Sequence, residues 1–256
     1  MVLILKKILF KLIQIYTYPL VINKKIYSFV RQKYFSHVWN HFFTTTDIIK
    51  ASQKTLDSSS IFIDVGSANG DTLLYLNKEF PGFPIYGFEP NEKVFLESFK
   101  KCNTYKNITI KNIALSDNTG EGTLFITQNL WSSSLMNVSA SISNDVKEQG
   151  VHVVDKQITR LQTLDEEFAN VNRIALLKLD TQGSELAILK AGTSVLKKTK
   201  YVLIEMNNNS VYENGCQYYD IDNFLRTNSF KLHTLFSSAY GITEYDALYI
   251  NTSVEF

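Results

Sequence analysis

Short apolar runs alternate with amphipathic segments along most of the chain. Runs such as residues 61–65 (IFIDV) and 84–88 (PIYGF) predict buried strands, because nearly all of their residues are apolar or aromatic. The segments at 71–80 and 91–102 place apolar residues at helical spacing, and Asn91 is suited to cap the second helix. Strands that alternate with helices of this length are typical of a parallel α/β sheet.

The same alternation continues to the C-terminal end of the chain. Further strands are predicted at residues 107–115, 173–180, 200–206, 230–236 and 245–250, and further helices at residues 184–192 and 218–228. The last two strands are separated by a short segment (SSAYGITE) that does not resemble a helix. We therefore expect an antiparallel strand inserted at one edge of the sheet.

One region, residues 116–162, interrupts the alternation. Its first part, DNTGEGTLFI, combines turn residues with a β-rich run and predicts a hairpin. A serine-rich stretch follows, within which Trp131 to Leu135 (WSSSL) forms either a segment that closes over a substrate or a plain surface loop.

The first part of the chain differs in character, and we divide the sequence into residues 1–57 and 58–256. The first segment is basic, aromatic and helical in pattern, and its first 46 residues contain no Asp or Glu. Its longest uncharged run, residues 12–23, is too short for a membrane span of about 20 residues. Two interpretations remain open: a helical segment packed on the domain, or a basic amphipathic helix in peripheral contact with an anionic membrane.

The net charge and the cysteine content argue against some classes of function. The formal net charge of +1 offers no general attraction for nucleic acid, so no nucleic-acid partner is expected. The two cysteines, Cys102 and Cys216, form no C-x-x-C pair, which excludes a zinc site built on thiolates and favours a cytoplasmic location.

The stretch from Ile61 to Thr72 carries the clearest chemistry. Two glycines, Gly66 and Gly70, follow a predicted strand and precede a predicted helix, an arrangement that lets a backbone turn tightly beside a ligand at a helix N-terminus. This arrangement suits either a dinucleotide or an adenosyl cofactor. Asp64 at the end of the strand suits a cationic amino-acid group rather than pyrophosphate, and Glu89 after the next strand suits ribose hydroxyls. The two acids therefore favour S-adenosyl-L-methionine over NAD.

Five sequence blocks in this order resemble the FkbM family of S-adenosyl-L-methionine-dependent methyltransferases. They are DVGSANGDT (64–72), FEP (88–90), NIALSDNTGEGTLF with a following SSSL (112–125 and 132–135), TLDE (163–166) and LLKLDTQGSELAILKAG (176–192). The resemblance extends from about Ile61 to the end of the chain. One departure is Ala68, where the family usually has Asn. The resemblance implies a class I methyltransferase fold, Rossmann-like and doubly wound, with a mostly parallel seven-stranded sheet, and activity on hydroxyls of sugars or natural products.

The resemblance also implies where the cofactor binds. The methionine part is expected near the loop after the first strand, the ribose near Glu89 and the adenine near Asn112 and Ala114. The full set of expected cofactor-binding residues is Asp64, Gly66, Ser67, Asn69, Gly70, Thr72, Glu89, Pro90, Asn112 and Ala114.

Two carboxylates, Asp180 and Glu205, are the candidate catalytic residues. Each follows or ends a predicted strand, and the carboxyl ends of neighbouring parallel strands meet at one crevice. Either acid could act as general base, or the pair could bind a divalent metal such as Mg²⁺ or Mn²⁺. The structural alternatives are that Asp180 caps the helix near Ser184 and that Glu205 pairs with Lys178.

We expect structural rather than catalytic roles for His37, His41 and His233. His233 is expected as a half-buried strand residue, and His37 and His41 as packing residues beside Trp39 and Phe42.

The expected activity is O-methylation of a sugar or glycan hydroxyl by a cytoplasmic enzyme, and membrane association of that enzyme stays open. Alternatives are a different small-molecule or lipid-linked acceptor, and a non-catalytic binding module. A nucleic-acid amino methyltransferase is disfavoured, because LDTQGS (179–184) lacks the proline-rich loop of that class. An NAD(P)-dependent oxidoreductase is disfavoured because no G-x-G-x-x-G loop occurs at this position.

Overall fold

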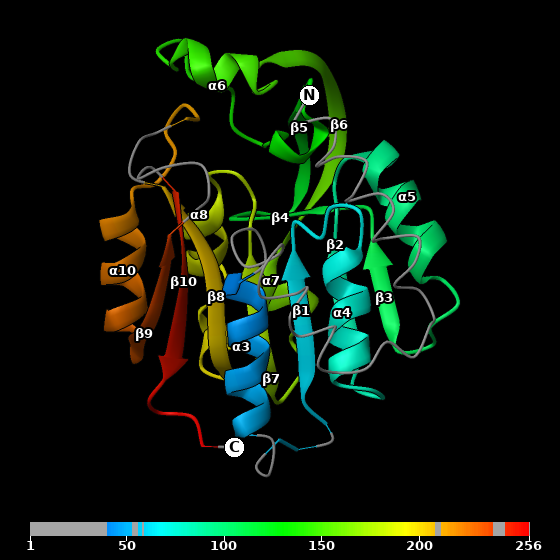
Figure 1. Ribbon diagram of the computed structural model, residues 1–256, viewed down its shortest axis with the longest axis vertical. Coiled ribbons are helices and arrows are strands. Elements are labelled where there is room, and N and C mark those ends of the chain that lie inside the picture. Colours follow the sequence, from blue (N-terminus) through cyan, green and yellow to red (C-terminus); the bar gives the residue numbers. More distant parts are fainter. Residues whose placement is uncertain (1–39, 53–55, 58, 208–210, 238–243, 256) are drawn as a thin grey trace, which may run out of the picture. The chain divides into compact units, whose positions relative to one another are not determined.

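The computed structural model describes residues 40–52, 56–57, 59–207, 211–237 and 244–255. Its main element is a seven-stranded sheet with the strand order β3-β2-β1-β7-β8-β10-β9 (Figure 1). The strands are β1 (Ile61–Val65), β2 (Ile85–Phe88), β3 (Ile108–Lys111), β7 (Ile174–Leu179), β8 (Thr199–Asn207), β9 (Phe230–Ser237) and β10 (Glu244–Asn251).

The expected sheet type is confirmed. Strands β3, β2, β1, β7 and β8 pair in parallel, whereas β10 is antiparallel to both β8 and β9. The antiparallel strand thus lies one place inside the edge, and β9 forms the edge itself.

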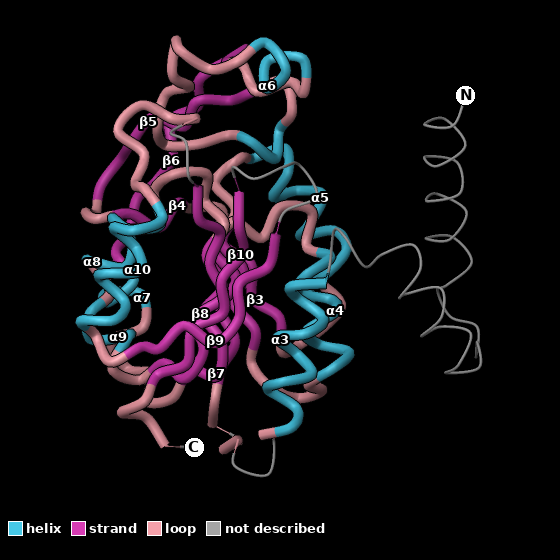
Figure 2. Tube along the Cα trace, turned by 60° about the vertical axis from the view of Figure 1, so that its left-hand side comes forward, coloured by secondary structure: helices cyan, strands magenta, loops and turns pink. Residues whose placement is uncertain are grey.

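Helices cover both faces of the sheet (Figure 2). One face carries α3 (Asn40–Ala51), α4 (Asp71–Glu79) and α5 (Glu92–Cys102). The opposite face carries α7 (Leu164–Glu167), α8 (Glu185–Lys190), α9 (Thr193–Leu196) and α10 (Tyr218–Thr227). Asn91 caps α5 as predicted, because its side-chain oxygen accepts hydrogen bonds from the backbone of Lys93 and Val94.

The main apolar core lies on the face that carries α8 and α10. Ile63 and Val65 of β1 belong to this core together with Leu177 and Leu179 of β7. Successive side chains of a strand point to opposite faces, so Asp64 points to the other face, where α3 and α4 lie. All five residues of β1 are buried, as expected for a parallel strand covered on both sides.

A second, three-stranded sheet has the order β4-β6-β5. It consists of β4 (Ala114–Ser116), β5 (Gly120–Thr127) and β6 (Val153–Thr163). The predicted hairpin at 117–126 is wrong, because β5 pairs with β6, and β4 also pairs with β6. The strand predicted at residues 107–115 is divided into two strands, β3 and β4, which belong to different sheets. The division falls at Asn112, whose side chain donates hydrogen bonds to the backbone after β2.

Helix α3 packs on the sheet although it precedes the predicted boundary at residues 57 and 58. Phe42 is buried, and its ring packs against Tyr75 of α4. The predictions for residues 1–39, including His37 and Trp39, lie outside the described residues, and the boundary stays a prediction. No helix in the described part of the chain is both long and apolar enough to cross a membrane.

Gly66 provides a test of how closely the ends of β1 and β7 approach. Its φ is +80°, and a Cβ atom at this position would lie 1.9 Å from the backbone oxygen of Asp180. Gly82 has a similar φ of +86° but no heavy atom within 4 Å of such a Cβ. We expect Gly66→Ala to lower the free energy of unfolding in urea by more than about 3 kcal/mol, and Gly82→Ala by about 1 kcal/mol, the cost of the left-handed conformation alone. Equal losses would contradict the close approach.

Candidate active site

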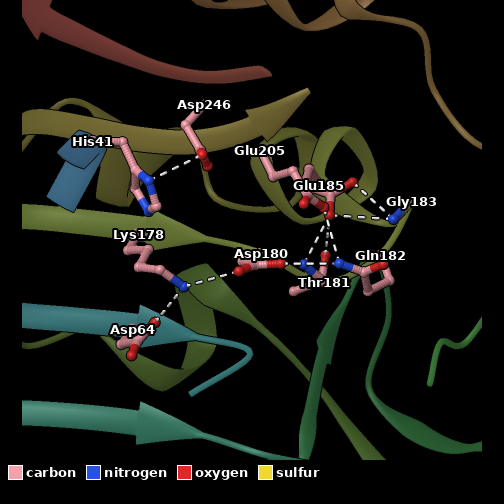
Figure 3. A network of polar contacts seen from close by, with 10 residues as sticks. All are labelled: His41, Asp64, Lys178, Asp180, Thr181, Gln182, Gly183, Glu185, Glu205 and Asp246. Atoms are coloured by element: carbon pink, nitrogen blue, oxygen red, sulfur yellow. Dashed lines mark hydrogen bonds and ion pairs between the residues drawn. The ribbon is translucent and has the colours of Figure 1, made fainter. Parts of the chain in front are cut away.

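Charged side chains from several strands meet at the carboxyl ends of the parallel strands (Figure 3). Asp64 comes from β1, Lys178 from β7 and Glu205 from β8, and Asp180 directly follows β7. Asp246 of β10 is opposite Glu205 in the antiparallel register, so it reaches the same end of the sheet. The structure therefore brings the predicted acids Asp64, Asp180 and Glu205 together.

Lys178 connects two of these acids. Its Nζ lies 3.1 Å from Oδ1 of Asp64 and 3.3 Å from Oδ2 of Asp180. Burial by itself lowers the pKa of Lys178, but the charges of Asp64 and Asp180 outweigh burial and raise it, so the side chain stays cationic. Burial raises the pKa of Asp64, and the Lys178 charge acts in the opposite direction.

One carboxylate oxygen of the cluster is left without a partner among the described residues. Asp64 is fully buried, and its Oδ2 has no hydrogen-bond partner among the described residues. An unpartnered buried carboxylate oxygen is costly unless a ligand satisfies it. The end of the sheet is thus suited to a ligand with a positive charge and N–H donors.

The loop after β1 makes hydrogen bonds and close packing contacts with other parts of the protein. The backbone amides of Gly66 and Ser67 both donate to the carbonyl of Phe88, at 3.0 and 2.9 Å. The side of Gly70 that a Cβ would occupy faces the Ser98 hydroxyl, 2.5 Å from such an atom. Both glycines are therefore required for packing inside the protein. Ala68 lies between them with a φ of +43°, a strained conformation of the kind that concentrates at ligand sites.

The other predicted residues of this loop have different surroundings. The Ser67 hydroxyl is buried and has no hydrogen-bond partner among the described residues, so it remains available to a ligand. The Asn69 side chain bonds to the backbone and the carboxylate of Asp71. Thr72 is buried in the first turn of α4.

Glu89 directly follows β2 and lies almost wholly inside the protein. Its Oε1 accepts a hydrogen bond of 2.8 Å from the backbone of Asn91. Burial raises the pKa of Glu89 to about 7, although the backbone amides of Asn91 and Ala68 oppose the shift. At neutral pH this carboxyl group is therefore close to its midpoint of ionisation.

Asn112 holds the segment that contains Glu89. Its side-chain amide donates to the carbonyls of Glu89 and Pro90, at 2.9 and 3.0 Å. Pro90 also accepts a hydrogen bond from Gln157 of β6. Ala114, the first residue of β4, is buried. A contact of Asn112 or Ala114 with adenine stays a prediction.

Gln182 lies between the two predicted catalytic acids. Its side-chain nitrogen donates to Oδ1 of Asp180 at 3.1 Å and to Oε2 of Glu205 at 2.9 Å. The start of α8 shows no side-chain cap hydrogen bond among the described residues, so Asp180 does not act as its cap. Glu185 instead accepts hydrogen bonds from the backbone of Thr181 and Gly183, in the turn before the helix. Burial raises the pKa of Glu185, and these bonds partly offset it.

Among the residues that the structure describes, the acids are not arranged as a metal site. Within the described ranges, no group of three or more His, Cys, Asp or Glu side chains is placed to hold a metal ion. Between Asp180 and Glu205 lies the NH₂ group of Gln182, which is a hydrogen-bond donor and cannot bind a cation. The described residues therefore do not fit the predicted Mg²⁺ or Mn²⁺.

The sequence interpretation missed a contact of His41. Its Nδ1 lies 3.2 Å from Oδ2 of Asp246, and its ring meets the edge of Phe236. Burial, together with the Lys178 charge, lowers the pKa of His41 to about 4, so the neutral ring contacts the carboxylate. No local signal in the sequence connects residues so far apart in the chain. His233, expected to be half-buried, is exposed and contacts the Thr234 hydroxyl.

Comparisons with known proteins identify a family. A family model described as the methyltransferase FkbM domain matches residues 64–232, a range that excludes His41 and Asp246. No curated protein sequence matches the chain.

The chain is similar to several solved structures. A magnesium protoporphyrin IX methyltransferase from Synechocystis with bound SAM is 12% identical, with 82% of this chain and 77% of that chain covered and a TM-score of 0.46. A fibrillarin from Aeropyrum pernix with bound S-adenosyl-L-methionine is 13% identical, with 75% and 66% covered and a TM-score of 0.45. An rRNA methylase from Streptococcus thermophilus is 12% identical, with 81% and 94% covered and a TM-score of 0.42. Likeness at this level carries no argument about substrate.

The raised pKa of Glu89 predicts how stability depends on pH. Between the unfolded value of 4.5 and the folded value of about 7, the folded protein holds a proton that the unfolded chain has lost. Stability contributed by Glu89 therefore falls as the pH rises from 5 to 8, whereas Glu89→Gln cannot titrate. We expect the difference in unfolding free energy, Glu89→Gln minus wild type, to grow by roughly 2 kcal/mol over this interval. Urea unfolding of the ligand-free proteins measures it, and a difference independent of pH would contradict the shift.

Proposed function

The chain belongs to the FkbM family of methyltransferases, and we propose that it transfers the methyl group of S-adenosyl-L-methionine to a hydroxyl of a sugar or glycan. The observation that carries the cofactor assignment is the buried Asp64 carboxylate at the carboxyl end of the sheet, whose Oδ2 has no partner among the described residues. This position is the usual ligand crevice of open α/β sheets.

The residues present fit the cofactor. Asp64 would accept a hydrogen bond from its α-ammonium group, and the Ser67 hydroxyl of the following loop has no partner of its own among the described residues. Glu89 would accept hydrogen bonds from the ribose hydroxyls, and these donors would favour its ionised form. When bound, the cofactor supplies a methyl group activated by a sulfonium. The chain supplies the carboxylates that would bind it.

Asp180 and Glu205 are proposed to face the acceptor. The Asp180 side chain is 38% exposed, so a ligand in the crevice can reach it. A hydroxyl acceptor must be oriented toward the methyl group and must lose its proton, and a carboxylate can accept that hydrogen bond and that proton. Two carboxylates side by side also match the neighbouring hydroxyls of a sugar, which favours a glycan over an isolated alcohol.

Other acceptors remain as alternatives. A lipid-linked glycan would suit the basic N-terminal segment, of which residues 1–39 lie outside the described residues. A nucleic acid is disfavoured by the formal net charge of +1. A non-catalytic binding module would bind the cofactor without transferring its methyl group, and the presence of both Asp180 and Glu205 argues against it.

Binding of S-adenosylhomocysteine tests the cofactor assignment. We expect micromolar affinity by isothermal titration calorimetry, and at least a several-fold loss in Glu89→Ala, because the ribose loses a charged hydrogen-bond acceptor. Glu97→Ala on the exposed side of α5 serves as the matched control and should bind like wild type. Equal affinity of the Glu89 variant and wild type would reject the role of Glu89.

Methyl transfer tests the acceptor assignment. Purified protein with isotope-labelled S-adenosyl-L-methionine is offered a panel of nucleotide sugars and oligosaccharides, and the label is expected on a sugar oxygen. Asp180→Asn should lower the rate by about 10²-fold or more, because the acceptor hydroxyl loses its proton acceptor, while the exposed control Asp155→Asn should not. Label that appears only on nitrogen, or only on non-sugar acceptors, would reject the sugar assignment.

A further inference from the structure

Gln182 connects the two proposed catalytic acids to a distant part of the chain. We infer that Gln182 is a positioning residue: its side chain fixes the separation of Asp180 and Glu205 and couples both acids to the serine segment, residues 131–135. The inference rests on the proposed function for the role of the acids.

Every polar position of the Gln182 amide is used. The two hydrogens of its NH₂ group are directed to two different carboxylates, Asp180 and Glu205 (Figure 3). Its side-chain oxygen lies 2.8 Å from the Tyr212 hydroxyl. Because carboxylates only accept hydrogen bonds, the two acids determine which end of the amide faces them. An amide turned the other way would place its oxygen against two carboxylates, which is unfavourable.

The serine segment contacts the same residue. The Ser134 hydroxyl donates to the backbone carbonyl of Gln182 at 2.7 Å. The Tyr212 hydroxyl lies within 2.8 Å of the Ser132 carbonyl as well as of the Gln182 side chain. Residues on either side of Tyr212 also pair with residues 137 and 139, which continue the serine segment. A movement of this segment therefore reaches both acids through Gln182.

The backbone of Gln182 indicates that its conformation serves more than folding. Its φ is +63°, a region that costs a residue with a side chain free energy and that occurs mainly where the surroundings enforce it. Glu185 already fixes the turn through the backbone of Thr181 and Gly183, without using the Gln182 side chain. A glycine at position 182 would adopt this φ without strain. The turn therefore does not require a side chain at this position.

The affinities for two ligands distinguish a positioning role of Gln182 from a role in folding. S-adenosylhomocysteine has no group at the position of the transferable methyl, whereas sinefungin carries an amine there, which the two acids should bind. We expect Gln182→Ala and Gln182→Gly to bind S-adenosylhomocysteine within about twofold of wild type and to bind sinefungin about tenfold more weakly, as measured by calorimetry. Gln182→Gly also removes the backbone strain, so equal losses in both variants assign the effect to the amide. Wild-type selectivity in either variant would overturn the inference.

Hydrogen exchange measures the coupling independently of any ligand. Backbone amides of residues 131–135 should exchange about tenfold faster in Gln182→Ala, Gln182→Gly and Tyr212→Phe than in wild type. The control Tyr219→Phe changes an exposed tyrosine of α10 and should leave the exchange unchanged. Unchanged exchange in the Gln182 variants would overturn the coupling. If wild type binds neither ligand, the proposed function fails, and the exchange result still decides the coupling.

Discussion

The buried ammonium of Lys178 between Asp64 and Asp180 is the contact on which the site depends. A charge inside a protein is costly unless it is paired, and removal of one partner typically costs about 3–5 kcal/mol. The pairing fixes the end of β1 against the end of β7, where Gly66 allows the two backbones to approach. It also leaves Oδ2 of Asp64 without a partner among the described residues. The same contact thus supports the fold and prepares a site for a cationic ligand.

The acids near this contact divide into two groups. Glu185 is used by the protein itself, since its carboxylate binds the backbone of the turn after β7. Asp64 and Glu89 each keep capacity for a ligand at the crevice. Asp180 and Glu205 both accept a hydrogen bond from the side-chain amide of Gln182. The arrangement is suited to holding hydroxyl groups beside a positively charged cofactor.

The fold was largely predictable, because its strands and helices follow local patterns of apolar residues. Strand β1 and helix α4 lie within a residue of the predicted bounds. The failures are all choices between distant partners. The pairing of β5 with β6 joins segments separated by a long loop. The break before Ala114 depends on backbone carbonyls after β2, which accept hydrogen bonds from the Asn112 side chain. Local periodicity contains no information about such partners.

The parts of the candidate site that belong to a sequence motif were predictable. The contacts that depend on tertiary packing were not. Asp64, Asp180 and Glu205 meet as predicted, because parallel strands bring their carboxyl ends together. The contact of His41 with Asp246 and the bridge of Gln182 to Glu205 depend on tertiary packing. Gly66 and Gly70 were recognised as special, but their packing against Asp180 and Ser98 was visible only in the structure.

The most direct measurement is the affinity of Asp64→Asn for S-adenosylhomocysteine, by calorimetry at pH 7.5. Asparagine keeps the shape of the side chain but removes its negative charge. We expect the variant to remain folded by circular dichroism and to bind at least about tenfold more weakly than wild type, because the ligand's ammonium group loses its charged partner. Wild-type affinity in the folded variant would contradict the assignment of Asp64 to the cofactor site.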